Sequence, residues 1–225
     1  MLKFKLKLPT AFLNINVTKK TYDDCKLYLE VQNDAIRYTN TFIGARANIR
    51  NELPEGIEKL QIHLQQLKKL IKSKAKKSKF VTLDIEYTKG DEKALVTLEN
   101  GKSAEIDVFV NRVYKPIDDI IASCLDEHQW CKIDSNILEL RSKEYESKNI
   151  SIKTNRYYFT INVDDAVFYE TEHNYEFHNS HFGVKFENFL ALLNADEEIL
   201  FGIDDKPVYR WRQGIFDIVE MVNFI

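Results

Sequence analysis

Seven lysines and no acidic residue lie between Leu64 and Lys79, although like charges one turn apart on a helix repel each other. An apolar repeat at intervals of four, three and four residues predicts a helix with one packing face, formed by Leu60, Leu64, Leu67 and Ile71. A second repeat at nearly the same spacing predicts a positively charged face, formed by Lys68, Lys72, Lys76 and Lys79. Such a face suits a repetitive, negatively charged partner. A solvated, lysine-rich helix end remains the alternative interpretation.

Two carboxylates, Asp84 and Glu86, share one face of a predicted strand, and Lys89 follows them. Clustered carboxylates can hold magnesium, and a neighbouring lysine can orient water, as in a metal-dependent nuclease. The acid-x-lysine spacing typical of such centres is absent. A nuclease centred on Asp84 and Glu86 is therefore kept as an alternative function.

Cysteine and histidine residues gather in two stretches, and these candidate zinc ligands are Cys124, His128, Cys131, His173, His178 and His181. Neither stretch has the paired Cys-x-x-Cys spacing of a zinc site, so we interpret these residues as structural. The sequence also contains no glycine-rich phosphate loop and no nucleophile elbow. We therefore expect a protein that is not an enzyme and that holds no metal and no other cofactor.

The 225 residues are 44% hydrophobic and 12% aromatic, which suffices for one large domain or two of about 110 residues. No apolar run is long enough to span a membrane, and the N-terminus alternates instead of forming a signal-peptide core. Three cysteines, an odd number, fit reduced thiols. We expect a soluble protein of the cytoplasm.

The net charge of −3 is unevenly distributed along the chain. Residues 1–115 carry 22 Lys and Arg against 14 Asp and Glu, a balance of +8. Residues 116–225 carry 10 against 21, a balance of −11. This asymmetry predicts a basic working surface on the first half and an acidic exterior on the second.

Hydrophobic patterning predicts a repeated order of elements. In the first half we expect a strand at 2–8, a short helix within 9–20, a hairpin turning at Asn33-Asp34, a third strand through Gly44, a short strand at 59–64, the lysine helix, and three strands within 80–110. In the second half we expect a helix at 115–128, strands at 136–142, 149–154, 156–163 and 166–172, a helix at 183–196, and three strands within 197–222. Corresponding landmarks lie about 110–123 residues apart, which indicates an internal duplication joined near Val110 to Pro116.

Two tandem domains of paired β-α-β-β-β units resemble the DNA polymerase sliding clamps. The likeness is strongest in "FGVKFENFLALLNADEEILFGIDDKPVYRW" and "FDIVEMV", where a phenylalanine-led helix precedes a strand, a turn with Lys-Pro and a final strand. Clamps of this family are closed rings of six such domains, with three per chain in bacterial dimers and two per chain in eukaryotic, archaeal and some bacteriophage trimers. The resemblance implies an α+β fold, domains at 1–112 and 113–225, and a homotrimeric ring.

The resemblance also implies a function and a set of site residues. A clamp encircles duplex DNA without reading its sequence and tethers a replicative polymerase as a processivity factor, with a clamp loader as a further partner, in the cytoplasm of a bacterium or a phage-infected host. Helices line the hole of such rings, so the implied DNA-binding residues are Lys68, Lys69, Lys72, Lys76, Lys77 and Lys79. The corresponding helix of the second half has only Lys185 as a cation, which departs from uniform lining of the hole. The third alternative is a structural or interaction protein of a virus or mobile element.

Clamps also capture hydrophobic peptides of their partners in a groove near the interdomain connector and a chain terminus. Matching by position alone implies a groove formed by Val113, Tyr114, Pro207, Tyr209, Met221 and Val222. The apolar tail "EMVNFI" is consistent with an exposed interaction site. The alternative, which stays open, is that Phe224 and Ile225 cover the core of the second domain.

Overall fold

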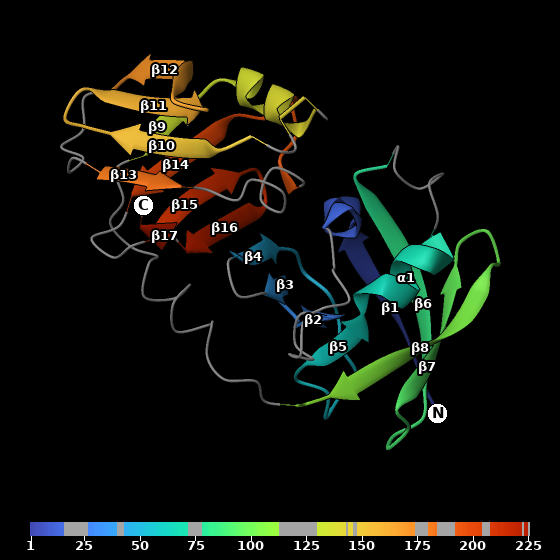
Figure 1. Cartoon of the computed structure of the whole chain (residues 1–225). Coiled ribbons are helices and arrows are strands. Elements are labelled where there is room, and N and C mark those ends of the chain that lie inside the picture. The colour runs from blue at the N-terminus through green and yellow to red at the C-terminus, as the bar shows by residue number, and fades with distance from the viewer. Residues whose placement is uncertain are drawn as a thin grey trace. The chain divides into compact units, whose positions relative to one another are not determined.

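The computed structural model of the chain describes residues 1–15, 27–39, 43–71, 78–112, 130–142, 144–145, 148–173, 180–183, 192–203, 208–221 and 223–224. The chain divides into two compact units, which are described separately below (Figure 1). Unit 1 comprises Met1–Asn40 and Ala45–Pro116, and unit 2 comprises Thr41–Gly44 and Ile117–Ile225. Within the described residues, no helix has the length and apolar character needed to cross a membrane.

The described residues of unit 1 form antiparallel strands, the 3-10 helix η1 and the α-helix α1. In chain order these are β1 (Leu2–Pro9), the 3-10 helix η1 (Thr10–Asn14), β2 (Tyr28–Val31), β3 (Ala35–Thr39), β4 (Ile43–Asn48), β5 (Leu60–His63), α1 (Leu64–Ile71), β6 (Phe80–Tyr87), β7 (Lys93–Leu98) and β8 (Ser103–Val110). The strands lie in the order β1-β6-β7-β8-β5-β2-β3-β4. The strands predicted for the first half are thus confirmed.

Strand β1 illustrates why the sequence pattern is reliable in unit 1. Leu6 and Leu8 are buried, whereas Lys3, Lys5 and Lys7 on the opposite face are exposed. The strand pairs with β6 along its whole length. The predicted turns after β6 and β7 contain Gly90 and Gly101 at φ values of 97° and 78°, a region that glycine adopts at little cost.

Strand β8 joins two groups of strands in unit 1. Its first five residues, Ser103 to Asp107, pair with β7. Its last three, Val108 to Val110, pair with β5. One continuous strand therefore connects β1-β6-β7 to β5-β2-β3-β4 (Figure 1).

The described strands of unit 2, and the 3-10 helix after the first of them, repeat the order seen in unit 1. These are β9 (Cys131–Ile133), the 3-10 helix η4 (Ser135–Arg141), β10 (Ile150–Thr154), β11 (Tyr158–Val163), β12 (Ala166–Glu172), β13 (Ser180–Gly183), β14 (Ile199–Ile203), β15 (Val208–Gln213), β16 (Phe216–Met221) and β17 (Asn223–Phe224). The strand order β9-β14-β15-β16 matches β1-β6-β7-β8, and β13-β10-β11-β12 matches β5-β2-β3-β4. The matched topology supports an internal duplication.

One expectation for the second half is corrected, and two others are only partly or not at all described. The predicted strand at 136–142 is wrong, because these residues belong to η4, which Asp134 caps by accepting a hydrogen bond from the Asn136 amide at 2.9 Å. Consequently β9 and η4 are the first elements of the second repeat, and they match β1 and η1 of the first. The predicted helix at 115–128, and residues 184–191 of the predicted helix at 183–196, lie outside the described residues.

An aromatic cluster fills the core of unit 2. The ring centroids of Phe159 and Phe201 are 4.4 Å apart, and those of Phe201 and Trp211 are 4.7 Å apart. All three side chains are fully buried. Because they come from β11, β14 and β15, the cluster packs the two sheets of unit 2 against each other.

A buried charge cluster lies on the opposite face of β15. Asp217 accepts hydrogen bonds from Arg210 at 3.3 Å and from Arg212 at 3.0 Å, and Arg210 is 1% exposed. The Arg212 guanidinium lies 4.5 Å from the ring centroid of Trp130. One buried carboxylate thus serves two guanidinium groups and compensates part of the cost of burying the charge of Arg210.

Strand β12 forms one edge of the five-stranded sheet and carries a β-bulge. Its register against β11 shifts between Ile161 and Asn162, so Phe168 has no paired residue. The β11–β12 turn consists of Asp164 and Asp165 at positive φ values of 47° and 68°, as the tight two-residue hairpin turn requires. β12 therefore presents an irregular edge.

The chain's last residues form part of the sheet. Asn223 and Phe224 of β17 pair with Gly183 and Phe182 of β13. Together β16 and β17 occupy the position that β8 has in unit 1, with Val222 between them. The backbone of Asn223 and Phe224 therefore completes a sheet, and the side chains of the tail lie outside the described residues.

Deleting Asn223 to Ile225 should remove the strand that links β13 to the end of β16. We expect the free energy of unfolding of unit 2 to fall by about 2 kcal/mol, corresponding to the removal of two backbone hydrogen bonds. Hydrogen exchange of the β13 amides should become faster, while exchange in β2 and β5 of unit 1 stays unchanged. Unchanged protection of β13 would contradict the pairing.

Candidate nucleic-acid interface

Helix α1 packs through its apolar face. Leu64, Leu67, Leu70 and Ile71 are buried, in agreement with the repeat seen in the sequence. Leu60, the first residue of that repeat, belongs to β5 and not to the helix. The helix and strand follow one another without a loop, so the repeat continues from one element into the next.

A reciprocal pair of hydrogen bonds fixes α1 against β8. Gln66 Nε2 donates to Asp107 Oδ2 at 2.5 Å, and the Asp107 amide donates to Gln66 Oε1 at 2.8 Å. Two bonds in opposite directions define the rotation of the helix about its axis. They consequently determine which residues of α1 face the solvent.

The lysines of this region have different roles. Lys68 is half-buried and donates from Nζ to the carbonyl oxygen of Ile15 at 2.7 Å, which ties α1 to the end of η1. Lys102, in the β7–β8 turn, donates to the carbonyl oxygen of Leu70 at 2.5 Å. Leu70 lies near the C-terminal end of α1, where a cation interacts favourably with the helix dipole. Lys69 is exposed, so its charge faces the solvent.

The predicted continuous positive stripe is only partly described. Residues 72–77, with Lys72, Lys76 and Lys77, lie outside the described residues. Lys79 is exposed but lies in a bend before β6, where its carbonyl accepts a hydrogen bond from the Thr10 amide at 3.0 Å. The assignment of Lys79 to the helical repeat is therefore wrong, because the backbone has already turned toward β6.

His63 caps the beginning of α1. Its Nδ1 accepts a hydrogen bond from the Gln66 amide at 3.4 Å, which requires a neutral imidazole. The ring also lies edge-on to Tyr28, with 5.1 Å between centroids. Burial lowers the pKa of His63, and the charge of Lys69 lowers it further, while Asp107 acts in the opposite direction.

Asp84 and Glu86 do not form a metal centre. They lie on one face of β6, as predicted, but each is opposite a lysine of β1. Glu86 is 2.6 Å from Lys3 Nζ, and Asp84 is 3.5 Å from Lys5 Nζ. Carboxylates paired in this way on an exposed sheet face are cross-strand ion pairs, and this geometry does not support the nuclease.

The candidate zinc ligands are not brought together in the part of the chain that is described. Cys131 is buried in β9, where desolvation raises the pKa of its thiol to about 11. His173 is buried beyond the end of β12. Cys124, His128 and His178 lie outside the described residues, and only the backbone of His181 is described. Among the described residues, no three His, Cys, Asp or Glu side chains are grouped to hold a metal ion.

The predicted peptide groove is largely outside the described residues. Val113, Tyr114, Pro207 and Val222 are not described, whereas the backbones of Tyr209 and Met221 belong to β15 and β16.

Sequence reasoning missed Gln66, Lys102 and Asp107, which hold α1 in place. Gln66 and Asp107 are 41 residues apart in the chain, so no local pattern relates them.

No protein-family model matches the sequence, and no match is found among curated proteins. Solved structures do resemble the chain. A DnaN sliding clamp (DNA polymerase III subunit beta) from Pseudomonas aeruginosa aligns over 98% of this chain with a TM-score of 0.66 and 13% identity. A putative DNA polymerase III beta subunit from Eubacterium rectale aligns over 98% with a TM-score of 0.65 and 12% identity.

The DNA polymerase III beta subunit from Thermotoga maritima aligns over 99% of this chain, with a TM-score of 0.61 and 11% identity. The chain spans 64–66% of the length of these three proteins. At such low identity the likeness concerns the fold. It extends over nearly the entire chain and therefore includes both repeats.

Because burial holds the pKa of His63 below its ordinary value of 6.5, the unfolded chain takes up the proton first as the pH falls. The stabilisation from the neutral cap should be complete above pH 6.5 and should be lost as the pH falls through the lowered pKa. Urea unfolding of the wild type at pH 7.5 and pH 5.5 should show this loss.

The variant His63→Asn keeps a side-chain acceptor at the cap but removes the titration, so it provides the matched control. We expect its stability to decrease less than that of the wild type between the two pH values. Parallel losses in the two proteins would show that His63 does not cap α1.

Proposed function

We propose that this chain is the subunit of a DNA sliding clamp, which encircles duplex DNA and tethers a replicative polymerase as a processivity factor. The observation that carries the proposal is the duplicated order of strands. This order accounts for the alignment of 98–99% of the chain with bacterial beta subunits. Residues 1–112 and 113–225 would be its two clamp domains.

The DNA-binding surface of the proposed clamp is centred on the lysines of α1 and the segment after it. Lys69, Lys72, Lys76, Lys77 and Lys79 would contact phosphates, and Lys68 would contribute its charge while bonded to Ile15. Lysine suits this role because it is a flexible point charge without the directional fork of arginine. Phosphate contacts give affinity without sequence preference, as a sliding protein requires.

Ring closure would use three copies, because six domains of this kind complete a clamp and each chain supplies two. The exposed edge of β12 is a candidate contact between copies, because an edge strand offers unpaired backbone groups. Three chains of 26.5 kDa give an assembly of about 80 kDa.

A polymerase and a clamp loader are the proposed protein partners. We place their peptide-binding groove at Val113, Tyr114, Pro207, Tyr209, Met221 and Val222, a location carried over from the family by position. Since β17 is paired with β13, the tail would border this groove as part of the sheet.

Charge reversal of Lys69, Lys72 and Lys76 should weaken DNA binding and abolish polymerase stimulation. Lys68 is left intact because its bond to Ile15 supports the fold. The logarithm of the DNA-binding constant falls linearly with the logarithm of the salt concentration, with a slope of about −0.9 for each neutralised phosphate. The variant's slope should therefore be shallower by about 0.9 for each phosphate that it no longer neutralises. Binding titrations at several salt concentrations measure this slope.

The matched control reverses Lys89, Lys93 and Lys153, three exposed lysines outside the α1 region. This variant has the same net charge as the first, and it should retain the salt slope and the stimulation. Equal effects in the two variants would show that net charge, and not the α1 surface, governs DNA binding.

Light scattering should give a mass of about 80 kDa, and the protein should be retained on closed circular DNA but run off after linearisation. A 26.5 kDa particle at micromolar concentration would contradict the ring. Cleavage of labelled DNA in the presence of magnesium would instead favour the nuclease.

A further inference from the structure

The helical side of unit 1, defined as Thr10–Ile15 and α1, contains no acidic side chain. Its charged residues are Lys68 and Lys69, and Lys102 reaches it through the carbonyl of Leu70. In the sequence, four more lysines follow within 72–77. The charged side chains of the described helical segments of unit 1 are therefore all positive.

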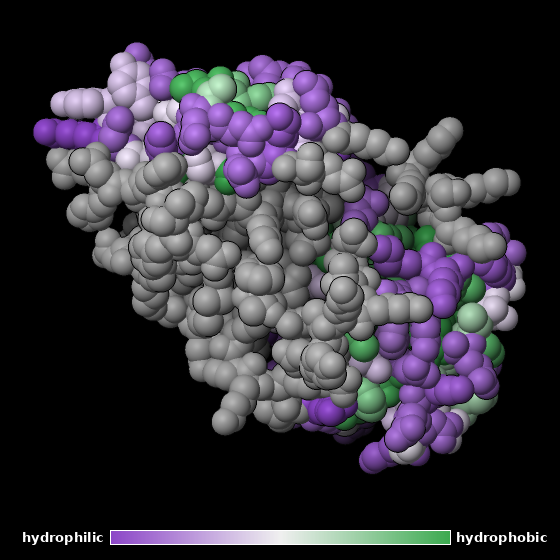
Figure 2. All heavy atoms as spheres, viewed as in Figure 1, coloured by the Kyte–Doolittle hydropathy of each residue, from purple (hydrophilic) through white to green (hydrophobic). Residues whose placement is uncertain are grey.

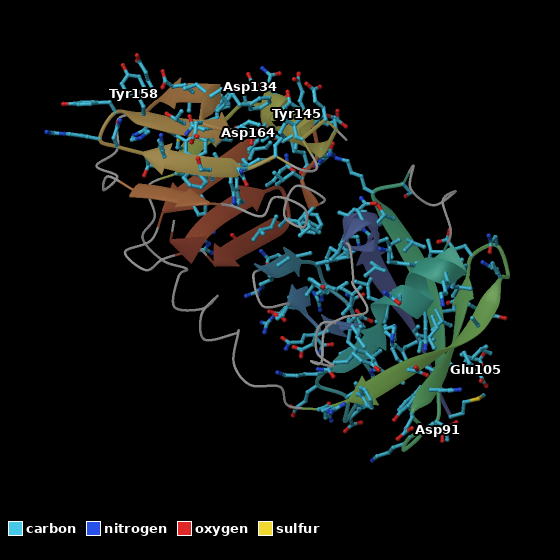
Figure 3. The ribbon with its side chains drawn as sticks, in the orientation of Figure 1. Asp91, Glu105, Asp134, Tyr145, Tyr158 and Asp164 are labelled. Carbon is cyan, nitrogen blue, oxygen red and sulfur yellow. The ribbon has the colours of Figure 1, made fainter. Side chains whose placement is uncertain are left out.

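The described acidic residues of unit 1 lie outside these helical segments. Asp107, beside α1, is engaged by Gln66. Asp91 lies in the β6–β7 turn, away from α1 (Figure 3). Asp84 and Glu86 on β6 are paired with the lysines of β1. None of the described acids belongs to the helical segments themselves.

The side of unit 2 that carries η4 is acidic. This helical side of unit 2 is defined as η4 and the turn at residues 192–198, which Arg141 connects by donating to the carbonyl of Leu193. Gln213 of β15 holds the turn as well, because its Nε2 donates to the carbonyl of Glu197 at 2.8 Å. The Arg141 bond thus places η4 and the turn next to each other.

Charges on this side of unit 2 are mostly negative. Its acids, together with the cap residue before η4, are Asp134, Glu139, Asp196, Glu197 and Glu198. Arg141 is its only cation in these described segments and is bonded to Leu193. Lys132 of β9 neutralises Glu198 at 3.4 Å. Figure 3 labels Asp134, and on the face seen in Figure 2 the described atoms of this unit are mostly hydrophilic.

We infer that duplex DNA contacts this chain through the helical side of unit 1 alone, and that the acidic helical side of unit 2 repels the phosphate backbone. The inference rests on the proposed clamp function and specifies which half of each chain holds the DNA. Its basis is charge complementarity: phosphates release counterions only where cations replace them.

The two sides would act differently on a moving duplex. At physiological salt, charges more than about 8 Å away are largely screened, so each phosphate responds to the side it is passing. Unit 1 attracts and unit 2 repels. Each chain would therefore neutralise fewer phosphates than a chain that is basic on the helical sides of both units.

Photo-crosslinking tests this assignment directly. Benzoylphenylalanine would replace, in separate variants, Lys69 on α1, Asn136 on η4 and Asp91 in the β6–β7 turn, three exposed positions. The full chain is irradiated with a linear duplex onto which a ring can thread from the ends. We expect strong crosslinking from position 69 and only background from positions 136 and 91.

Each other result has a defined meaning. Equal crosslinking from positions 69 and 136 would overturn the inference and leave the proposed clamp intact. Crosslinking from none of the three positions would overturn the proposed function and the inference with it. Thermal unfolding of each variant verifies that the substitution has not disrupted the fold.

A charge-inversion pair provides a second readout. Glu139→Lys should create a phosphate contact on unit 2, tightening binding about eightfold at 0.1 M salt and steepening the salt slope by about 0.9. Asp91→Lys makes the same change of charge in the β6–β7 turn and should leave both quantities nearly unchanged. Equal gains in the two variants would overturn the repulsion by unit 2.

Discussion

The pairing of Val108 to Val110 with β5 is the connection on which the architecture of unit 1 depends. Without it, β1-β6-β7 and β5-β2-β3-β4 would be separate groups of strands. Asp107 lies where β8 passes from one group to the other, and its hydrogen bonds with Gln66 join β8 to α1 at that point. In unit 2 the corresponding connection is made by β16 and β17 together, so a strand of only two residues has the role of the end of β8.

Basic side chains bonded to backbone carbonyls are the second feature shared by the units. In unit 1 the cation Lys68 is on the second helix and the carbonyl, Ile15, is at the end of the first. In unit 2 the arrangement is reversed, because Arg141 of the first helix bonds Leu193 in the second segment. The bond of Lys68 joins α1 to the end of η1, and the bond of Arg141 joins η4 to the turn before β14. Desolvation lowers the pKa of Arg141, although a guanidinium remains charged at neutral pH.

The sequence predicted unit 1 well because its strands are long and alternate. β1 and the glycine turns of β6–β8 follow from local patterns alone. η4 was mistaken for a strand because Ile137, Leu138 and Leu140 satisfy both a short alternation and a helical spacing. Its N-cap, Asp134, was the available signal, since aspartate before an apolar run favours a helix start.

The candidate site could be predicted only in its composition. The lysine-rich segment and the apolar face of α1 are visible in the sequence. The bond from Lys68 to Ile15 is not, because 53 residues separate them, and neither is the turn that removes Lys79 from the helix. Tertiary contacts thus divided a set of similar lysines into structural and solvent-facing ones. β17 was missed because two residues are too few to produce a periodic signal.

The pairing of β1 with β6 has a consequence for the synthesis of the protein. Lys3 and its partner Glu86 are 83 residues apart, so at a translation rate of about 5–20 residues per second β1 waits about 4–17 s for β6. During this interval an apolar strand has an unpaired edge and can associate with other nascent chains. Lys3, Lys5 and Lys7 interrupt its apolar residues with charge. The same lysines that form surface ion pairs after folding thus oppose aggregation before it.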